Sequence, residues 1–276
     1  RIQEGGPLTG NYFQKIVRPK FARLVTLLQA LMIRHTKAQR ISGDVALKLP
    51  ELEAETVWLT MSNAEKRRYT DARSTDSARW SLSIKDEGAT VWAATMRMSG
   101  MMSFCSVADR KLRALVDDLT SLREKEPHMH AVVFTQSVAA HEQICSSVRG
   151  AGFTVYEISG CSDVKKRHRS IRAFQAAEAT AKVFVLTMKT GNCGITLTAA
   201  TRVYLMEPCI DPAHEQQAAG RIHRLGQHKD VLCKRFCFLD TYEQQVVELH
   251  TRLKNGTASL TDGRLSGTLF QLLTSK

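Results

Sequence analysis

Short apolar runs alternate with amphipathic stretches from about residue 107 onward. The runs at 131–136, 153–159, 182–187, 202–206 and 231–239 have the length and β-branched or aromatic content of buried strands. Apolar residues at helical spacing predict helices over 108–122, 141–152, 163–175, 211–225 and 241–254. Strands and helices in alternation predict an α/β fold with a parallel sheet and helices on both faces. In such sheets, ligands bind at the carboxyl ends of the strands.

The first 104 residues lack this alternation of strand-like and helix-like stretches and are predicted to be mostly helical and irregular. Residues 21–33 carry apolar positions at helical spacing. Ser62 is expected to cap a helix, with Glu65 three residues later as the reciprocal partner of a capping box. We therefore predict a mainly helical segment over 1–106, the α/β unit over 107–240, and a final helix with a tail over 241–276.

Charge adds a candidate partner. The chain of 276 residues has a formal net charge of +12, and residues 1–40 hold eight Lys or Arg residues against one acid, Glu4. A polyanion fits this excess, and nucleic acid is the commonest one. No apolar run approaches the roughly 18 residues of a membrane span. Arg1 opens a polar stretch without a signal peptide, so we expect a fragment of a longer protein.

The seven cysteines favour reduced, buried thiols in an intracellular protein. Their number is odd and no CxxC pair exists, which argues against a disulfide framework or a zinc site. We therefore predict no metal ligands in this chain.

Two loops carry candidate chemistry. The segment 188–200 contains Gly191 and Gly194, which allow close backbone approach to a ligand, beside Lys189 and Thr190. A loop that only connects two elements would often contain two glycines as well. In "QQAAGRIHRLGQ" (216–227), Gln217, Arg221 and Arg224 would share one face of the predicted helix. Two guanidinium groups so placed suit phosphate, although one near a helix end also complements the helix dipole.

These stretches together resemble the Swi/Snf-type ATPases, helicase-like DNA translocases that include chromatin remodellers. Gln217 to Gln227 match the final motif of that family, Q-A-x-x-R-x-x-R-x-G-Q, and "VVFTQ" (132–136) resembles the motif that opens its second lobe. Gly160, Arg167, Ile171 and Phe174 match G-x6-R-x3-I-x2-F, and "LMIRHTK" (31–37) with "LKLP" (47–50) resembles the segment between the lobes. Residues 240–254 resemble the helix that braces lobe two against lobe one. The subgroup with an embedded RING domain is nearest in the linker, but this chain has no RING.

The resemblance implies a RecA-like second lobe, of the P-loop NTPase type, and a role for each matched residue. Arg221 and Arg224 would be catalytic arginine fingers for the γ-phosphate of ATP, and Gln217, Gly191 and Gly194 would lie near the nucleotide. The implied contacts to DNA phosphates are Thr135, Gln136, Lys189, Thr190 and Arg167. The implied cofactors are ATP and Mg²⁺, the ion being held by the first lobe. Double-stranded DNA or nucleosomes and the first lobe are the implied partners, in the nucleus and away from membranes.

The first-lobe machinery is missing from the sequence. Gly5 and Gly10 have the spacing of a phosphate loop, but Asn11 and Tyr12 follow where Lys and Ser or Thr are needed. "DEGA" at 86–89 imitates a magnesium-binding box without the buried strand that precedes such a box. We expect ATP hydrolysis only when the chain is joined to a first lobe.

Three departures from the family pattern bear on function. Ile210 stands where a DNA-contacting Trp is usual, Arg34–His35 replaces an arginine pair, and Thr196 replaces an Asn. Two alternatives to a translocase therefore stay open: a non-catalytic DNA-binding or scaffold module, and a strand-separating helicase of a sister family. The basic run 165–169 is open as well, as a nuclear-import tag, a DNA patch or a solvated helix face.

Overall fold

The computed structural model describes residues 40–41, 44–45, 48–80, 98–158, 163–177, 180–191 and 194–256. The chain divides into two compact units, residues 1–48 and 49–276. In the first unit, the described residues are Lys48 and the antiparallel strands β1 (Arg40–Ile41) and β2 (Asp44–Val45). The helix predicted over 21–33, the Arg34–His35 pair, Gly160 and the stretch 86–89 lie outside the described residues.

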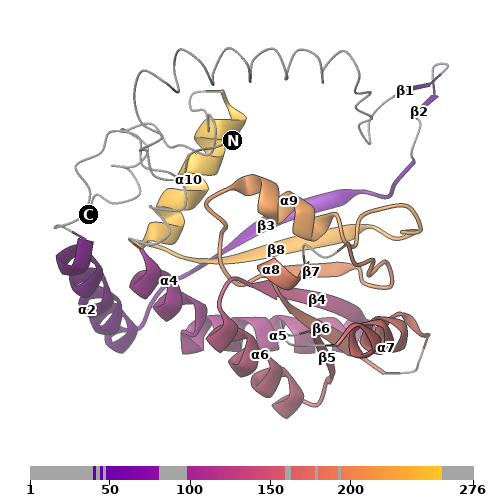
Figure 1. Cartoon of the computed structure of the whole chain (residues 1–276), viewed down its shortest axis with the longest axis horizontal. Helices are drawn as coiled ribbons and strands as arrows, with labels where there is room; N and C mark the ends of the chain where they lie inside the picture. Colours follow the sequence, from indigo (N-terminus) through magenta and orange to yellow (C-terminus); the bar gives the residue numbers. More distant parts are fainter. Residues whose placement is uncertain are drawn as a thin grey trace, which may run out of the picture. The chain divides into compact units, whose positions relative to one another are not determined.

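A six-stranded parallel sheet forms the centre of the second unit, with the order β3-β8-β7-β4-β6-β5 (Figure 1). Its strands are β3 (Leu52–Leu59), β4 (His130–Thr135), β5 (Thr154–Ile158), β6 (Lys182–Thr187), β7 (Arg202–Leu205) and β8 (Val231–Phe238). The predicted parallel α/β sheet is confirmed. Because every pair is parallel, all six carboxyl ends meet at one edge of the sheet.

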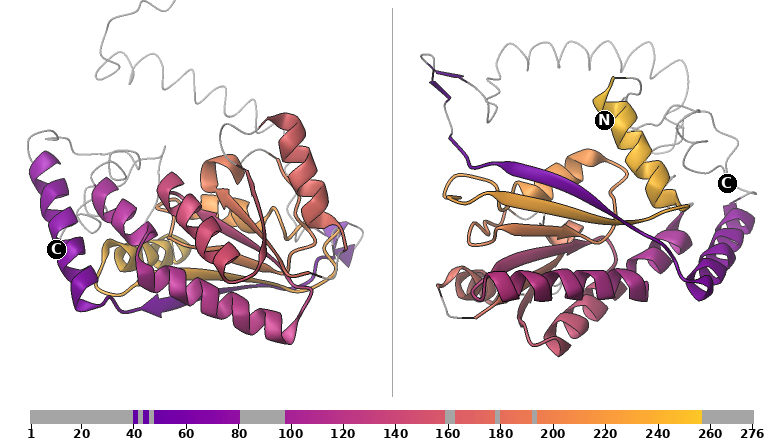
Figure 2. Two further views of the ribbon diagram at one scale, coloured as in Figure 1. Left: turned by 90° about the horizontal axis from the view of Figure 1, so that it is seen from below. Right: turned by 180° about the vertical axis from the view of Figure 1, so that it is seen from behind.

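Eight described helices surround this sheet. They are α2 (Asn63–Trp80), α4 (Ser99–Ser106), α5 (Asp109–Lys125), α6 (Val138–Gly150), α7 (Val164–Gln175), α8 (Met188–Gly191), α9 (Pro212–Ala219) and α10 (Tyr242–Lys254). Figures 1 and 2 show α5 and α6 on one side of the sheet and α9 on the other. The predicted cover of both faces is therefore present.

Three apolar clusters account for this arrangement. Leu115 and Leu119 of α5 and Ile144 of α6 pack on the side chains of one sheet face. Phe174 of α7 and Ala218 of α9 pack on those of the other. A third cluster joins α2, α4 and α10 to the end of β8. Buried apolar area is the main source of stability in such layers.

Strand β3 is not predicted by the sequence pattern. Its residues pair with β8 over the full length of both strands, so a segment upstream of the predicted α/β unit extends the sheet. Most of its residues are exposed because β3 is an edge strand, and "ELEAE" (51–55) therefore carries few apolar positions. The strand predictions depended on runs of apolar residues, and an exposed edge strand such as β3 does not need such a run.

The described cysteines are free and buried, as predicted: Cys105, Cys145, Cys209, Cys233 and Cys237. Burial is the first cause that raises the pKa of each of these thiols above its ordinary value. Among the described residues, no helix has the length and apolar character that a membrane span requires.

Candidate functional site

The helix that leads to the two candidate arginines starts as predicted and ends earlier than predicted. The Asp211 side chain accepts a hydrogen bond from the Ala213 N–H at 2.8 Å, and Pro212 occupies the first turn. The helix then stops at Ala219, with Gly220 as its C-cap. Arg221 and Arg224 therefore lie in the turns after α9. The prediction that they share a helical face with Gln217 is wrong.

Gln227 holds this arginine-bearing loop in place. Its side chain is buried, and its Nε2 donates to the carbonyls of Ala200 at 2.8 Å and Thr198 at 3.1 Å. Its Oε1 accepts from the backbone N–H groups of His228 and Lys229. Such a fully used amide fixes both chain segments that it joins. The last Gln of the matched motif was the sequence signal for this role, which sequence reasoning left unassigned.

The two arginines are tied to the segment that enters β7. The Arg224 Nη1 donates to the Thr196 hydroxyl at 3.0 Å, and the Arg221 carbonyl accepts from the Leu197 N–H at 2.9 Å. Both arginine side chains are partly exposed. Thr196, the departure from the family's Asn, thus supplies a polar contact to Arg224. Gly226 completes the loop with a φ of 97°, a conformation that favours glycine.

This loop lies toward the amino ends of the strands. The His223 Nε2 contacts the Pro50 carbonyl at 2.8 Å, just before β3, and Gln227 contacts Ala200, just before β7. The arginine loop therefore does not lie at the carboxyl ends of the strands, where ligands usually bind in such sheets. Helix α9 starts beyond the carboxyl end of β7 and returns across the sheet face before the loop begins.

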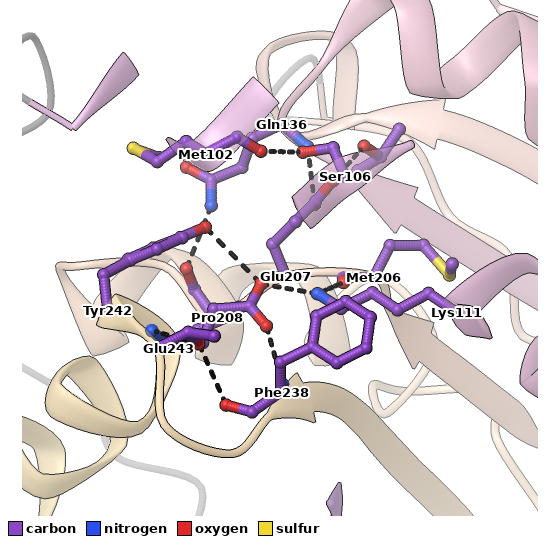
Figure 3. A network of polar contacts seen from close by, with 12 residues as sticks. Met102, Ser106, Lys111, Gln136, Met206, Glu207, Pro208, Phe238, Tyr242 and Glu243 are labelled. Carbon is purple, nitrogen blue, oxygen red and sulfur yellow. Dashed lines mark hydrogen bonds and ion pairs between the residues drawn. The ribbon is translucent and has the colours of Figure 1, made fainter. Parts of the chain in front are cut away.

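A second group of predicted residues does lie at the carboxyl edge (Figure 3). Thr135 is the last residue of β4 and Gln136 comes directly after it. Glu207 follows β7 and lies near Gln136. The Thr135 hydroxyl donates to Glu207 Oε1 at 2.7 Å, and the Gln136 N–H donates to Oε2 at 3.0 Å. The Gln136 side chain donates to the Pro208 carbonyl at 3.0 Å. One buried carboxylate therefore shapes the loop after β4.

Thr135 and Gln136 differ in accessibility. Thr135 has no exposed surface, so in this conformation it orients the loop, whereas Gln136 is partly exposed. Glu207 is the residue that sequence reasoning missed here. Its signal was an acidic residue directly after an apolar strand.

The loop after β6 forms the short helix α8 and presents the other predicted residues. Lys189 is exposed, whereas Thr190 is buried and its hydroxyl donates to the Thr187 carbonyl at 2.9 Å. Gly191 ends this helix. Gly194 is exposed, and its φ of 66° lies in the region that favours glycine. Lys189 is thus the accessible cation of this loop.

Helix α7 carries the basic run 165–169 beyond the end of β5. Lys165, Lys166, His168 and Arg169 are exposed, and Arg167 is partly buried. Arg167 thus differs from its neighbours in accessibility. The rest of the run has the accessibility of a solvated helix face.

Ile210 occupies the position where the family pattern has Trp. Its side chain is 4% exposed and packs in the cluster of α4 and α10. A side chain enclosed in this way is not available for contact with a nucleic-acid strand.

Three possible metal donors lie together on α6 and β5. His141, Cys145 and Glu157 place one donor atom each within 4.8 Å of one another. Burial, followed by the contact with Glu157, raises the pKa of Cys145 to about 12, so the thiol keeps its proton. That thiol donates to Glu157, whose carboxylate also pairs with Arg149 at 2.9 Å. The His141 ring contacts the Val185 carbonyl at 3.3 Å, so we interpret the group as a Cys145–Glu157–Arg149 set of hydrogen bonds with His141 beside it.

Comparison with known proteins agrees with the family resemblance of the sequence motifs. The helicase conserved C-terminal domain family matches residues 110–226. The chain is 38% identical over 151 residues to a putative SWI/SNF-related matrix-associated actin-dependent regulator of chromatin, subfamily A member 3-like 1, from Arabidopsis thaliana, covering 54% of this chain and 17% of that protein. It is 35% identical over 143 residues to the human helicase-like transcription factor, covering 51% and 14%. The chain spans less than a fifth of the length of either relative.

Solved structures share the fold. The C-terminal part of the Fun30 ATPase domain superposes with a TM-score of 0.61 at 15% identity, over 82% of this chain and 96% of that one. The Sulfolobus solfataricus SWI2/SNF2 ATPase core in complex with double-stranded DNA gives 0.57 at 18% identity, over 90% and 56%.

Proposed function

We propose that this chain, which matches the helicase conserved C-terminal domain family over residues 110–226 and is similar to SWI/SNF-related proteins, is the second lobe of an ATP-dependent double-stranded-DNA translocase. The related proteins are named as chromatin regulators and DNA repair proteins, so its work would be chromatin remodelling or DNA repair, in the nucleus. The observation that carries the proposal is the loop of Arg221 and Arg224, anchored by Gln227 and partly exposed.

In this proposal the two arginines approach the γ-phosphate of ATP across the cleft between the lobes. Guanidinium groups are rigid forks that match phosphate oxygens and spread positive charge over the transferring group. Gln217, exposed on α9, would lie near the nucleotide together with Gly191, the last residue of α8, and Gly194. Arg221 and Arg224 fit such a role because Gln227 fixes the loop that carries them. The magnesium ion would be held by the first lobe.

The carboxyl edge is proposed to contact the DNA backbone. Lys189 and Gln136 are accessible there, and Thr135 and Thr190 hold their loops in shape from buried positions. Arg167 would contribute from α7. Contacts to phosphates position a protein on DNA without reading its sequence, which suits translocation. Nucleosomes would be bound through the same backbone contacts.

The test uses a protein that joins this chain to its first lobe. Arg221→Ala and Arg224→Ala are each expected to lower the DNA-stimulated ATPase rate by about 10³-fold or more, the scale of an arginine finger. Arg149→Ala serves as control because it removes an exposed arginine on α6, on the other face of the sheet. The finger assignment is wrong if both variants keep the rate of the parent while the far-ultraviolet circular dichroism is unchanged.

A second candidate is a non-catalytic DNA-binding module. The burial of Ile210 favours it, because a Trp at that position is the expected contact to the tracked strand. In that case the two-lobed protein would bind duplex DNA with no DNA-stimulated ATP hydrolysis. Strand displacement in the same assay would instead indicate a helicase of a sister family.

A further inference from the structure

A fully buried lysine lies between the central sheet and α10. Lys111, on α5, donates from Nζ to Glu243 Oε1 at 2.5 Å and to the Met206 carbonyl at 2.7 Å. Both charged side chains have 0% exposure. The ammonium group also lies 5.2 Å from the centroid of the Phe238 ring. Water is thus excluded from both charges, and each depends on the other for compensation.

Glu243 fixes the first turn of α10 to several elements at once. Its Oε2 accepts from the Phe238 N–H at 2.8 Å, at the end of β8. The neighbouring Tyr242 donates its N–H to the Tyr69 hydroxyl of α2 at 2.9 Å. The carboxylate therefore connects α5, β8 and α10, and the tyrosine pair adds α2.

The same lysine connects α10 to the candidate DNA edge (Figure 3). Lys111 holds the Met206 carbonyl, and the next residue is Glu207, whose carboxylate shapes the loop of Thr135 and Gln136. Met206 itself donates its N–H to the Phe134 carbonyl at 3.0 Å. Hydrogen bonds therefore join Glu243 of α10 to Lys111 and Lys111 to the Met206 carbonyl. The peptide chain leads from Met206 to Glu207, which bonds Gln136.

Stability alone does not account for such a pair. Two buried charges lose their hydration, and well-packed apolar residues of similar volume are often as stabilising or more so. Burial alone would lower the pKa of Lys111, but the Glu243 carboxylate raises it above its ordinary value, so the lysine is charged in the folded protein. What the pair adds is a defined geometry, because an ion pair with fixed hydrogen bonds permits one docking of α10.

We propose that Lys111 and Glu243 form a clasp that couples the position of α10 to the loop of Gln136 at the candidate DNA edge. Both are positioning residues, since neither reaches the surface. If the clasp couples these elements, movement of α10 changes how DNA stimulates ATP hydrolysis. This consequence rests on the proposed function. Its structural part, the coupling of α10 to Gln136, stands apart from that function.

The decisive variant removes both charges together, as Lys111→Met with Glu243→Gln. Each single substitution leaves an uncompensated buried charge and is expected to be strongly destabilising, whereas the double variant is expected to fold. Amide hydrogen exchange at Gln136 should then become about tenfold faster or more. In the two-lobed protein, the ratio of DNA-stimulated to basal ATPase should fall about twofold to thirtyfold, the usual range for coupling between sites, with the basal rate unchanged.

The matched control is an exposed ion pair on the same helix. Arg252→Met with Glu248→Gln removes equal and opposite charges from the surface of α10 and should leave both readouts unchanged. Should the Lys111 and Glu243 double variant fail to fold, Glu243→Asp decides, because it keeps both charges and shortens the acid. It should show the same two changes to a smaller degree.

The clasp is overturned if the folded variant exchanges its Gln136 amide at the parent rate. A two-lobed parent protein without DNA-stimulated ATPase would contradict the proposed function instead, and the exchange measurement would still decide the clasp. Faster exchange with an unchanged stimulation ratio would keep the coupling of α10 to Gln136 and refute its effect on catalysis.

Discussion

Glu65 holds the first turn of α2 with one carboxylate oxygen and the start of α5 with the other. Its Oε2 accepts from the Ser62 N–H at 2.8 Å and from the Ser62 hydroxyl at 2.7 Å. Its Oε1 accepts from the Arg110 N–H at 3.2 Å. Because Glu65 is only 7% exposed, these bonds replace most of its hydration. The residue is thus a local cap and a link between two helices.

The stability of the fold should depend on the charge of Glu65. Burial alone would raise the pKa of Glu65, but the bonds from Ser62 and Arg110 lower it below the ordinary 4.5. A carboxyl with a lowered pKa in the folded state adds stability above its unfolded pKa and loses it as the pH falls through the folded value. We expect Glu65→Gln to weaken the loss of unfolding free energy between about pH 5 and pH 3.

Urea unfolding at a series of pH values measures this dependence. Ser62→Ala should remove the hydroxyl that donates to Glu65 and accepts from the Glu65 N–H, and it should cost about 0.5–2 kcal/mol at pH 7, the range of N-cap substitutions. It should also flatten the acid limb, because the pKa of Glu65 then lies closer to its unfolded value. An acid limb in Glu65→Gln that is as steep as in the parent would show that other carboxyl groups account for it.

At the residue scale, a side-chain contact could be predicted from the sequence only when its two residues are close together along the chain. Ser62 and Glu65 are three residues apart, and the capping box was predicted from sequence and is confirmed. Lys111 and Glu243 are 132 residues apart, and Lys111 looks like any polar residue of an amphipathic helix. A local hydrogen bond has a sequence signature, whereas a buried ion pair needs the tertiary fold to bring its partners together.

At the scale of elements, the strands and helices with a buried face were predictable, and their ends were less so. Helix α9 ends at Ala219, just before Gly220, whereas the predicted helix ran on through the arginines. Glycine in a helix interior costs about 1 kcal/mol relative to alanine. In addition, the bond from Gln227 to the Ala200 carbonyl holds the loop after α9 in a non-helical conformation. The long-range bonds of Gln227 could not be read from a helical periodicity.

Arg235 joins three elements that sequence periodicity treats separately. Its Nη1 donates to Glu215 of α9 at 2.7 Å and to His250 of α10 at 3.1 Å. Its Nη2 donates to Thr56 of β3 at 2.8 Å. A planar guanidinium reaches all three partners from one position. Lysine has one compact ammonium group, so it cannot replace these bonds together.

Arg235→Lys should therefore lower the free energy of unfolding by about 1–3 kcal/mol, the scale of hydrogen bonds to a charged group. Arg149→Lys provides the control, because its partner Glu157 is 39% exposed and a surface pair contributes about 0–1 kcal/mol. Urea unfolding of both variants makes the comparison. Equal stability in the two variants would mean that Arg235 is not the link between α9, β3 and α10.

At the scale of the whole molecule, topology separates the two groups of proposed site residues. The parallel sheet brings the loops after β4, β6 and β7 to its carboxyl edge. Helix α9 then carries the chain back to the arginine loop near the amino ends. The family resemblance identified both groups of residues, but periodicity could not tell that they lie apart. The carboxyl edge and the arginine loop are linked through α9 and the loop of residues 194–200.

Charge at this scale leads to the last prediction, on binding of the chain to duplex DNA. Each phosphate neutralised by a cation releases a counterion, so log K should fall linearly with log salt, with a slope of about −0.9 per phosphate contact and no dependence on DNA sequence. Lys189→Gln should reduce that slope by about 1, because Lys189 is exposed at the carboxyl edge. Lys125→Gln removes the same charge from the end of α5 that precedes β4, and should leave the slope unchanged. Fluorescence anisotropy across a salt series measures both. If the two variants reduce the slope equally, the chain attracts DNA through its overall net charge of +12, and the carboxyl edge is not the contact surface.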